Sequence, residues 1–111
     1  MGLIEIRITA PDNETADAIA QTLVEERLAA CVQQLPAITS TYRWEGKIER
    51  STEILLLAKT TAESFDKVCD RVASLHPYDV PEILAVPVSA GLSSYETWVG
   101  QSVADPRPPA S

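Results

Sequence analysis

The sequence predicts an α+β fold with the elements in the order β-α-β-β-α-β, followed by a short helix. Three observations lead to this order. Apolar and charged residues alternate strictly at the start of the chain, two later segments have helical spacing, and a Glu45-Gly46 turn separates two extended segments between those helices. The order is that of the split βαβ, or ferredoxin-like, arrangement, in which both helices cover one face of the sheet.

The first strand is expected over residues 3–9, where isoleucines alternate with Glu5 and Arg7, which is typical of a strand with one buried face. Pro11 interrupts the strand, and Asp12 is a good N-cap for a following helix. Apolar residues then recur at helical spacing, which predicts a helix over residues 12–28.

An extended pattern resumes over residues 29–33 and is interrupted at Pro36. Residues 38–44 and 47–59 flank Glu45-Gly46 and predict a β-hairpin in which glycine supplies a positive φ. The far end of the second arm, residues 54–58, is apolar on both faces and is expected to be a central strand.

Thr60 and Glu63 are spaced as a capping box for a second amphipathic helix, which Pro77 ends. Residues 83–88 predict a last strand, and its prolines suit the edge of a sheet. A short helix is expected over residues 95–99. Residues 1–103 are therefore expected to form one domain, and residues 104–111 a disordered tail.

The composition excludes several classes of protein. Hydrophobic residues make up 45% of the chain, which argues against disorder, and the net charge of −7 disfavours phosphate backbones and anionic lipids. We therefore expect no nucleic-acid partner and no membrane partner. The sequence shows no export signal, so we expect a cytoplasmic protein in which Cys31 and Cys69 are free thiols.

Two features predict self-association. If residues 47–59 form one strand, its thirteen residues span about 43 Å, whereas a compact chain of this size has a diameter of about 34 Å. The hairpin would then overhang its own body unless a neighbour accepts it. Leu55 and Leu57 are also expected on the sheet face away from the helices, where they would form an exposed apolar patch. The alternative is a bulge near residues 50–52 that folds the arm back.

The segment from His76 to Glu82 is the most informative stretch of the sequence. His76 is the only histidine and is a candidate metal ligand; the alternative is a histidine that ends a helix and bonds its last carbonyl groups. Pro77 and Pro81 rigidify the segment, so it is expected to hold Tyr78, Asp79 and Glu82 in fixed positions. The sequence offers no nucleophile–base pair, phosphate loop or cysteine–histidine cluster, so we expect neither an enzyme nor a catalytic residue.

Several motifs together resemble the CutA family of divalent-cation tolerance proteins. The matching stretches are Thr9-Ala10-Pro11-Asp12, Glu26-Arg27-Leu28-Ala29-Ala30-Cys31, Tyr42-Arg43-Trp44-Glu45-Gly46-Lys47-Ile48-Glu49, Leu57-Ala58-Lys59-Thr60, His76-Pro77-Tyr78-Asp79-Val80-Pro81-Glu82-Ile83 and Tyr95-Glu96-Thr97-Trp98. The resemblance implies a ferredoxin-like protomer in a tight homotrimer whose long hairpins wrap the neighbouring subunit. It also implies a role in tolerance of copper and other divalent cations.

The resemblance carries over only one copper ligand. The family's copper-binding bacterial members have a cysteine before Thr-Ala-Pro-Asp and a second histidine before His-Pro-Tyr, where this sequence has Ile8 and Leu75. His76 is the ligand that remains, so copper or another divalent cation is a possible rather than a required cofactor.

An alternative function follows from a likeness of fold to the trimeric nitrogen-regulatory signalling proteins. It is a signalling module that binds a small metabolite or anion in clefts between subunits. The candidate cleft residues are Lys59, Tyr78, Glu82 and Trp98. Lys59 is included because it ends the central strand beside an expected helix N-terminus, a position that suits an anion.

Overall fold

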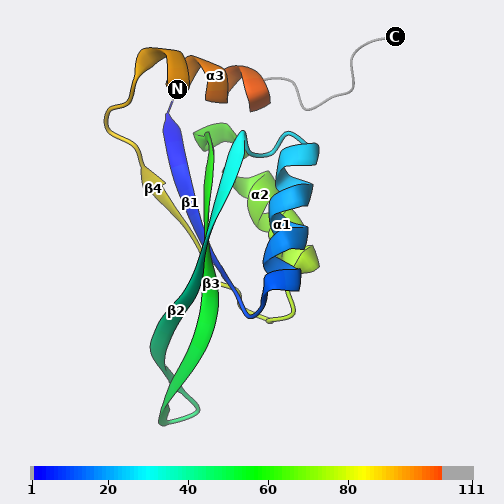
Figure 1. Ribbon diagram of the computed structural model, residues 1–111, viewed down its shortest axis with the longest axis vertical. Coiled ribbons are helices and arrows are strands. Elements are labelled where there is room, and N and C mark those ends of the chain that lie inside the picture. Colours follow the sequence, from blue (N-terminus) through cyan, green and yellow to red (C-terminus); the bar gives the residue numbers. More distant parts are fainter. Residues whose placement is uncertain (1, 104–111) are drawn as a thin grey trace.

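The computed structural model describes residues 2–103 and confirms the predicted order of elements (Figure 1). The elements are β1 (Leu3–Ala10), α1 (Asn13–Glu25), β2 (Cys31–Trp44), β3 (Lys47–Thr61), a 3₁₀ turn (Ala62–Ser64), α2 (Phe65–Leu75), β4 (Ile83–Pro87) and α3 (Ser93–Val103). The tail expected over residues 104–111 lies outside the described residues.

The four strands form one antiparallel sheet in the order β2-β3-β1-β4, which is the predicted ferredoxin-like topology. Helices α1 and α2 lie on the same side of this sheet (Figure 1). The core fills the space between them and consists of aliphatic side chains with no exposed surface, among them Ile6, Ile8, Ile19, Leu56 and Val68. Burial of each such side chain contributes roughly 1.5–3 kcal/mol.

Helix α1 begins as predicted and ends earlier than predicted. The Asp12 carboxylate accepts a hydrogen bond from the Thr15 N–H at 2.7 Å, which confirms the N-cap. The helix ends at Glu25 because Arg27 adopts a left-handed conformation with φ of 60°. The Leu28 N–H then donates to the Leu23 carbonyl oxygen at 2.9 Å, which is the Schellman pattern of helix termination.

Strand β2 runs through the interruption that was expected at Pro36. A bulge between Leu35 and Ile38, with Ala37 at a φ of 62°, absorbs the irregularity, so both predicted extended segments belong to one strand. This strand lies at the edge of the sheet, where proline is tolerated because its missing N–H is not needed for a second ladder.

The β2–β3 hairpin is long and twisted (Figure 1), and the predicted alternative of a bulge near residues 50–52 is wrong. The pairing of the two strands runs without a shift from Ile38↔Glu53 to Trp44↔Lys47. Glu45 and Gly46 both have positive φ values, 50° and 80°, as a two-residue type I′ turn requires. The hairpin therefore projects beyond the helices (Figure 1), and the longest dimension of the molecule is 51 Å.

The capping box predicted at Thr60 and Glu63 does not form. Thr60 belongs to β3, where it pairs with Ile4, and its buried hydroxyl group donates to the Leu28 carbonyl oxygen at 2.7 Å. A side chain engaged in this tertiary contact is not available to a helix N-terminus.

Helix α3 is longer than the helix predicted over residues 95–99. It lies across the end of the sheet near the start of β1 (Figure 1), and it buries Val99 and Val103. Burial of Val103 explains why the helix continues beyond residue 99.

Candidate functional site

His76 ends α2 and is tied to β1. The side chain is buried, and Nε2 lies 2.7 Å from the carbonyl oxygen of Thr9. A carbonyl oxygen can only accept, so Nε2 carries the proton and donates. Nδ1 is then the acceptor for the Tyr78 N–H at 3.2 Å, and both ring nitrogens of the neutral imidazole are satisfied. The expectation that this ring bonds the last carbonyl groups of its helix is wrong; only the backbone N–H of His76 does so, to Val72.

This arrangement does not suit a resident copper ion. A neutral histidine binds a metal through its unprotonated nitrogen, and in His76 that nitrogen already accepts a hydrogen bond. Ile8 belongs to the core and Leu75 packs against it, and neither carries a donor atom. Within residues 2–103, no group of three or more histidine, cysteine, aspartate or glutamate side chains is placed to hold a metal ion.

A cavity of about 780 Å³ opens between the β2–β3 hairpin and the segment 77–82, and we call it the hairpin cavity. Three aromatic side chains, Tyr42, Trp44 and Tyr78, contribute to its wall. The ring of Tyr78 packs against the ring of His76, at a centroid distance of 4.8 Å. The predicted candidates Tyr78 and Glu82 thus line one cavity.

The wall of the hairpin cavity is acidic. Four carboxylates line it, from Glu49 and Glu53 on β3 and from Asp79 and Glu82 on the segment after α2, and its lining includes no lysine, arginine or histidine. Glu53 is only 6% exposed. Burial, together with the nearby Glu53 carboxylate and Tyr42, raises the pKa of Tyr78, so its hydroxyl group stays protonated at neutral pH.

The other two predicted cleft residues lie elsewhere in the protomer. Lys59 is on the sheet face opposite the helices, where its Nζ lies 2.9 Å from Glu5 Oε2 and 3.0 Å from Gln33 Oε1. Its charge is therefore paired with a carboxylate. Trp98 is on α3, next to Tyr95 at a ring-centroid distance of 5.6 Å. One chain does not bring the four candidates together, so a cleft that includes all of them requires a second copy.

Sequence reasoning missed the two glutamates on the hairpin. The Glu45-Gly46 turn could have placed Glu49, because a two-residue turn sets Tyr42 opposite Glu49. The same count places Glu53 opposite Ile38, because the pairing runs without a shift from the turn to that pair. The approach of both glutamates to residues 77–82 is a long-range contact, which the count does not give.

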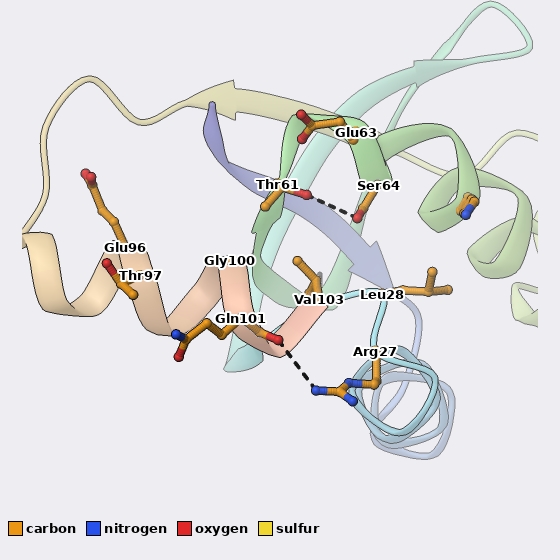
Figure 2. Close-up of a pocket in the computed structure, with 11 residues that line it drawn as sticks. Arg27, Leu28, Thr61, Glu63, Ser64, Glu96, Thr97, Gly100, Gln101 and Val103 are labelled. Atoms are coloured by element: carbon orange, nitrogen blue, oxygen red, sulfur yellow. Dashed lines mark hydrogen bonds between the residues drawn. The ribbon is translucent and has the colours of Figure 1, made fainter. Parts of the chain in front are cut away.

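A second cavity of about 580 Å³ lies between α3, the end of α1 and the turn after β3 (Figure 2). Some of its polar groups form hydrogen bonds within the chain. Arg27 donates from Nε to the Ser102 carbonyl oxygen at 3.0 Å, and from Nη2 to Gln101, while the Thr61 and Ser64 hydroxyl groups lie 3.3 Å apart. These contacts hold α3 in place, and none of the predicted site residues lines this cavity.

Comparison with known proteins gives a consistent result. The family model described as CutA1 divalent ion tolerance protein matches residues 4–102. The divalent-cation tolerance protein CutA of Thermus thermophilus is 50% identical over 87% of this chain and 94% of its own length. The chain spans about half the length of the mammalian CutA relatives that it matches.

Solved structures agree with this match. The crystal structure of CutA from Xylella fastidiosa is 48% identical, with a TM-score of 0.90 over 93% of this chain and 99% of the other. The structure of an Archaeoglobus fulgidus protein, described as a periplasmic divalent cation tolerance protein CutA, is 44% identical, with a TM-score of 0.89 over 91% of this chain and 98% of the other.

Proposed function

Because this chain belongs to the CutA1 divalent ion tolerance protein family, we propose that it acts in divalent-cation tolerance as a homotrimer and without catalysis. The family is named for tolerance and not for a reaction. The observation that carries the proposal is the sheet face opposite α1 and α2, on which several leucine side chains are exposed or half-buried in the single chain.

The uncovered sheet face has the character of an interface. Leu35 and Leu84 are 45% and 57% exposed, and Leu55 and Leu57 are half-buried. The strand register places Leu57 and Leu84 in one row across the sheet, on either side of Arg7. Exposed leucines gathered on one sheet face, around the paired charges of Arg7, Glu5 and Lys59, are typical of a contact with another protein surface.

The hairpin supports the same proposal. The molecule measures 51 × 33 × 21 Å, and its radius of gyration of 14.9 Å exceeds the ~13 Å expected for a compact chain of about 100 residues. Trp44 and Ile48, near the tip, are 61% and 62% exposed. A projecting pair of strands with apolar side chains and unpaired edges is stabilised when a neighbouring subunit packs against it.

Sedimentation equilibrium tests the assembly. We expect a species of about 36 kDa, three times the 12.1 kDa of the chain. Leu84→Lys places a charge on the uncovered face and is expected to dissociate the assembly, whereas the control Val24→Lys places the same charge on an exposed position of α1 and leaves it intact. A wild-type species near 12 kDa contradicts the proposal.

A more specific part of the proposal is that His76 binds copper. Binding requires Nδ1 to release the Tyr78 N–H, so we expect it to be weak. Calorimetric titration of the wild type and of His76→Ala with Cu²⁺ is the test, with circular dichroism to confirm that the variant is folded. A site that saturates in the wild type and is lost in the variant supports the assignment; equal binding, or no saturable site, refutes it.

The second candidate is a signalling module that binds a small metabolite between subunits. The hairpin cavity favours this candidate, because its volume lies within the range of about 300–1,000 Å³ found for ligand sites. Its four carboxylates disfavour an anion at that place. A screen of melting temperature against nucleotides and amino acids is the test, since a ligand that binds only the folded state raises the melting temperature; an unchanged melting temperature throughout counts against it.

We also propose that the protein works in the cytoplasm. Cys31 and Cys69 are both free thiols, which is the usual state in a reducing compartment. No helix within residues 2–103 has the length and apolar character needed to cross a membrane. The Archaeoglobus relative is described as periplasmic, so cell fractionation is the appropriate test, and recovery in the periplasm would contradict the proposal.

A further inference from the structure

We propose that α3 is a hinged lid on the end of the sheet, which opens as a unit while the rest of the domain stays folded. The inference rests on three features of this helix: its buried side chains lie outside the core, a cavity lies beneath it, and one side chain holds its far end. It concerns a motion within one chain and does not depend on the proposed role in cation tolerance.

The side chains that α3 buries are separate from the main core. Val99 and Val103 are the buried residues of the helix, and neither belongs to the core cluster that joins β1, α1, β3 and α2. The aromatic residues of the helix, Tyr95 and Trp98, are 39% and 45% exposed. An element that buries so little apolar surface can detach without disrupting the core, because the two do not share buried side chains.

A cavity separates one side of α3 from the body of the domain (Figure 2). Thr97, Gly100 and Gln101 of the helix line this cavity of about 580 Å³. Leu28 and Thr61, which are both buried, line it from the body. Side chains that face an open cavity meet solvent in place of protein atoms, so this side of α3 adds little packing energy.

The segment before α3 is suited to act as the hinge. The Val88 N–H donates to the Leu3 carbonyl oxygen at 3.0 Å, and this bond holds the chain to the start of β1. Residues 89–92 follow, and all four are exposed. One of them is Gly91, a residue type with wide backbone freedom. Rotation about residues 89–92 therefore moves α3 and leaves every strand pairing intact.

The far end of α3 is held by Arg27. The last turn of the helix has no basic residue of its own, and the Arg27 guanidinium group donates to the Ser102 and Gln101 carbonyl oxygens. When these bonds break, the end of the helix is released. Opening then exposes the two buried valines and the wall of the cavity beneath them. It also displaces Trp98, one of the predicted cleft residues.

Thiol labelling at two buried valines tests the proposal. Val99→Cys introduces a thiol on α3, and the matched control Val68→Cys introduces one on α2 in the core; neither valine has exposed surface. Both variants also carry Cys31→Ser and Cys69→Ser, which remove the native thiols. With iodoacetamide we expect position 99 to react at least about a hundredfold faster than position 68. Its rate should also depend less on urea, because opening of α3 exposes less surface than global unfolding.

Two further substitutions separate opening of α3 from global unfolding. Ile19→Val weakens the core on α1 and is expected to speed labelling at position 68 by about fivefold. It should leave position 99 unchanged, because the core is still folded when α3 is open. Arg27→Ala removes the bonds to the far end of α3 and is expected to speed labelling at position 99 by about fivefold.

Four results would overturn the proposal. The first is the same rate and the same urea dependence at positions 99 and 68, and the second is equal acceleration of both by Ile19→Val. The third is an unchanged rate at position 99 in Arg27→Ala. The fourth is a rate at position 99 that falls as the protein concentration rises, which indicates that α3 is uncovered only when subunits separate. If a cysteine variant does not fold, hydrogen exchange of the α3 and α2 amides in the wild type replaces labelling, and equal protection of the two helices is then the contrary result.

Discussion

The Thr60 hydroxyl group donates a hydrogen bond to the carbonyl oxygen of Leu28, 2.7 Å away, in the interior of the protein. Thr60 has no exposed surface, and Leu28 is 8% exposed. The bond connects the central strand β3 to the turn that follows α1, beside a backbone bond from Ala30 to Lys59. It therefore fixes where the chain leaves the helix and enters β2.

Substitution of Thr60 by valine tests the contribution of this bond. Valine has nearly the same shape, so the main change is a buried carbonyl oxygen that loses its donor. We expect the free energy of unfolding to fall by about 1–3 kcal/mol in urea denaturation. Thr41→Val, on the exposed hairpin arm, is the control and is expected to change stability by less than about 0.5 kcal/mol. Equal stability of the two variants would contradict the role of the bond.

The ion pair between Glu5 and Lys59 predicts a loss of stability in acid. The hydrogen bond from Lys59 is the main cause that lowers the pKa of Glu5 below its ordinary value of 4.5. A carboxyl group whose pKa is lowered on folding stabilises the fold above about pH 4.5, and that contribution is lost as the pH falls through the folded-state pKa. The pair is partly exposed, so its contribution is on the order of 1 kcal/mol or less.

Comparison of Glu5→Gln with the wild type isolates this contribution, because Asp12 and Glu26 also have lowered pKa values and act in the same direction. We expect the variant to be less stable than the wild type at pH 7 and equally stable at pH 3, measured by denaturant unfolding. A difference that is the same at both pH values would show that the carboxylate charge of Glu5 does not stabilise the fold.

Local patterns predicted the elements of this fold and long-range contacts decided the details. The alternation in β1, the N-cap at Asp12 and the Glu45-Gly46 turn are properties of neighbouring residues, and the structure confirms each of them. The spacing of Thr60 and Glu63 fits a capping box equally well, but Thr60 bonds Leu28, which is 32 residues earlier. Sequence spacing does not show that the Thr60 hydroxyl group bonds Leu28 instead of capping the helix.

The same distinction between local patterns and long-range contacts applies to the candidate site. The prolines of the segment from His76 to Glu82 predicted that it holds Tyr78, Asp79 and Glu82 in fixed positions, and all three residues line the hairpin cavity. The partner of the His76 ring, Thr9, is 67 residues away, so the state of the ring nitrogens could not be predicted. The hairpin turn sets Glu53 opposite Ile38, but the contact of Glu53 with the cavity formed by residues 77–82 is long-range and could not be predicted from that register.

The backbone and the side chain of Arg27 are expected to have opposite effects on the stability of the fold. Its φ of 60° costs a non-glycine residue roughly 1–2 kcal/mol, while its guanidinium group binds the Ser102 and Gln101 carbonyl oxygens at the end of α3. We expect Arg27→Gly to be more stable than Arg27→Ala by about 1 kcal/mol, because both lose the guanidinium group and glycine alone relieves the backbone.

Hydrogen exchange separates the two effects at Arg27. In both variants the amides of the last turn of α3 are expected to exchange faster than in the wild type, because the carbonyl groups at its end lose their donor. Exchange in α3 that is the same as in the wild type would mean that Arg27 does not anchor this helix.

The tip of the hairpin predicts one destabilising and one stabilising substitution. Gly46 has a φ of 80°, and a Cβ placed there would have no neighbour within 4 Å, so any cost of Gly46→Ala comes from the backbone alone. We expect that cost to be about 1 kcal/mol. Glu45, at a φ of 50°, occupies the position that asparagine favours in a type I′ turn, so Glu45→Asn is expected to raise the free energy of unfolding by about 0.5 kcal/mol.

Denaturant unfolding of both tip variants, with Glu45→Ala as the control for loss of charge, completes the test. Glu45→Ala removes the carboxylate without supplying a side chain that tolerates a left-handed conformation, so its free energy of unfolding is expected to stay near that of the wild type while that of Glu45→Asn rises above it. Wild-type stability of Gly46→Ala would show that the tip does not adopt the two-residue turn. The register of the arm, and with it the placement of Tyr42 opposite Glu49 in the hairpin cavity, depends on that turn.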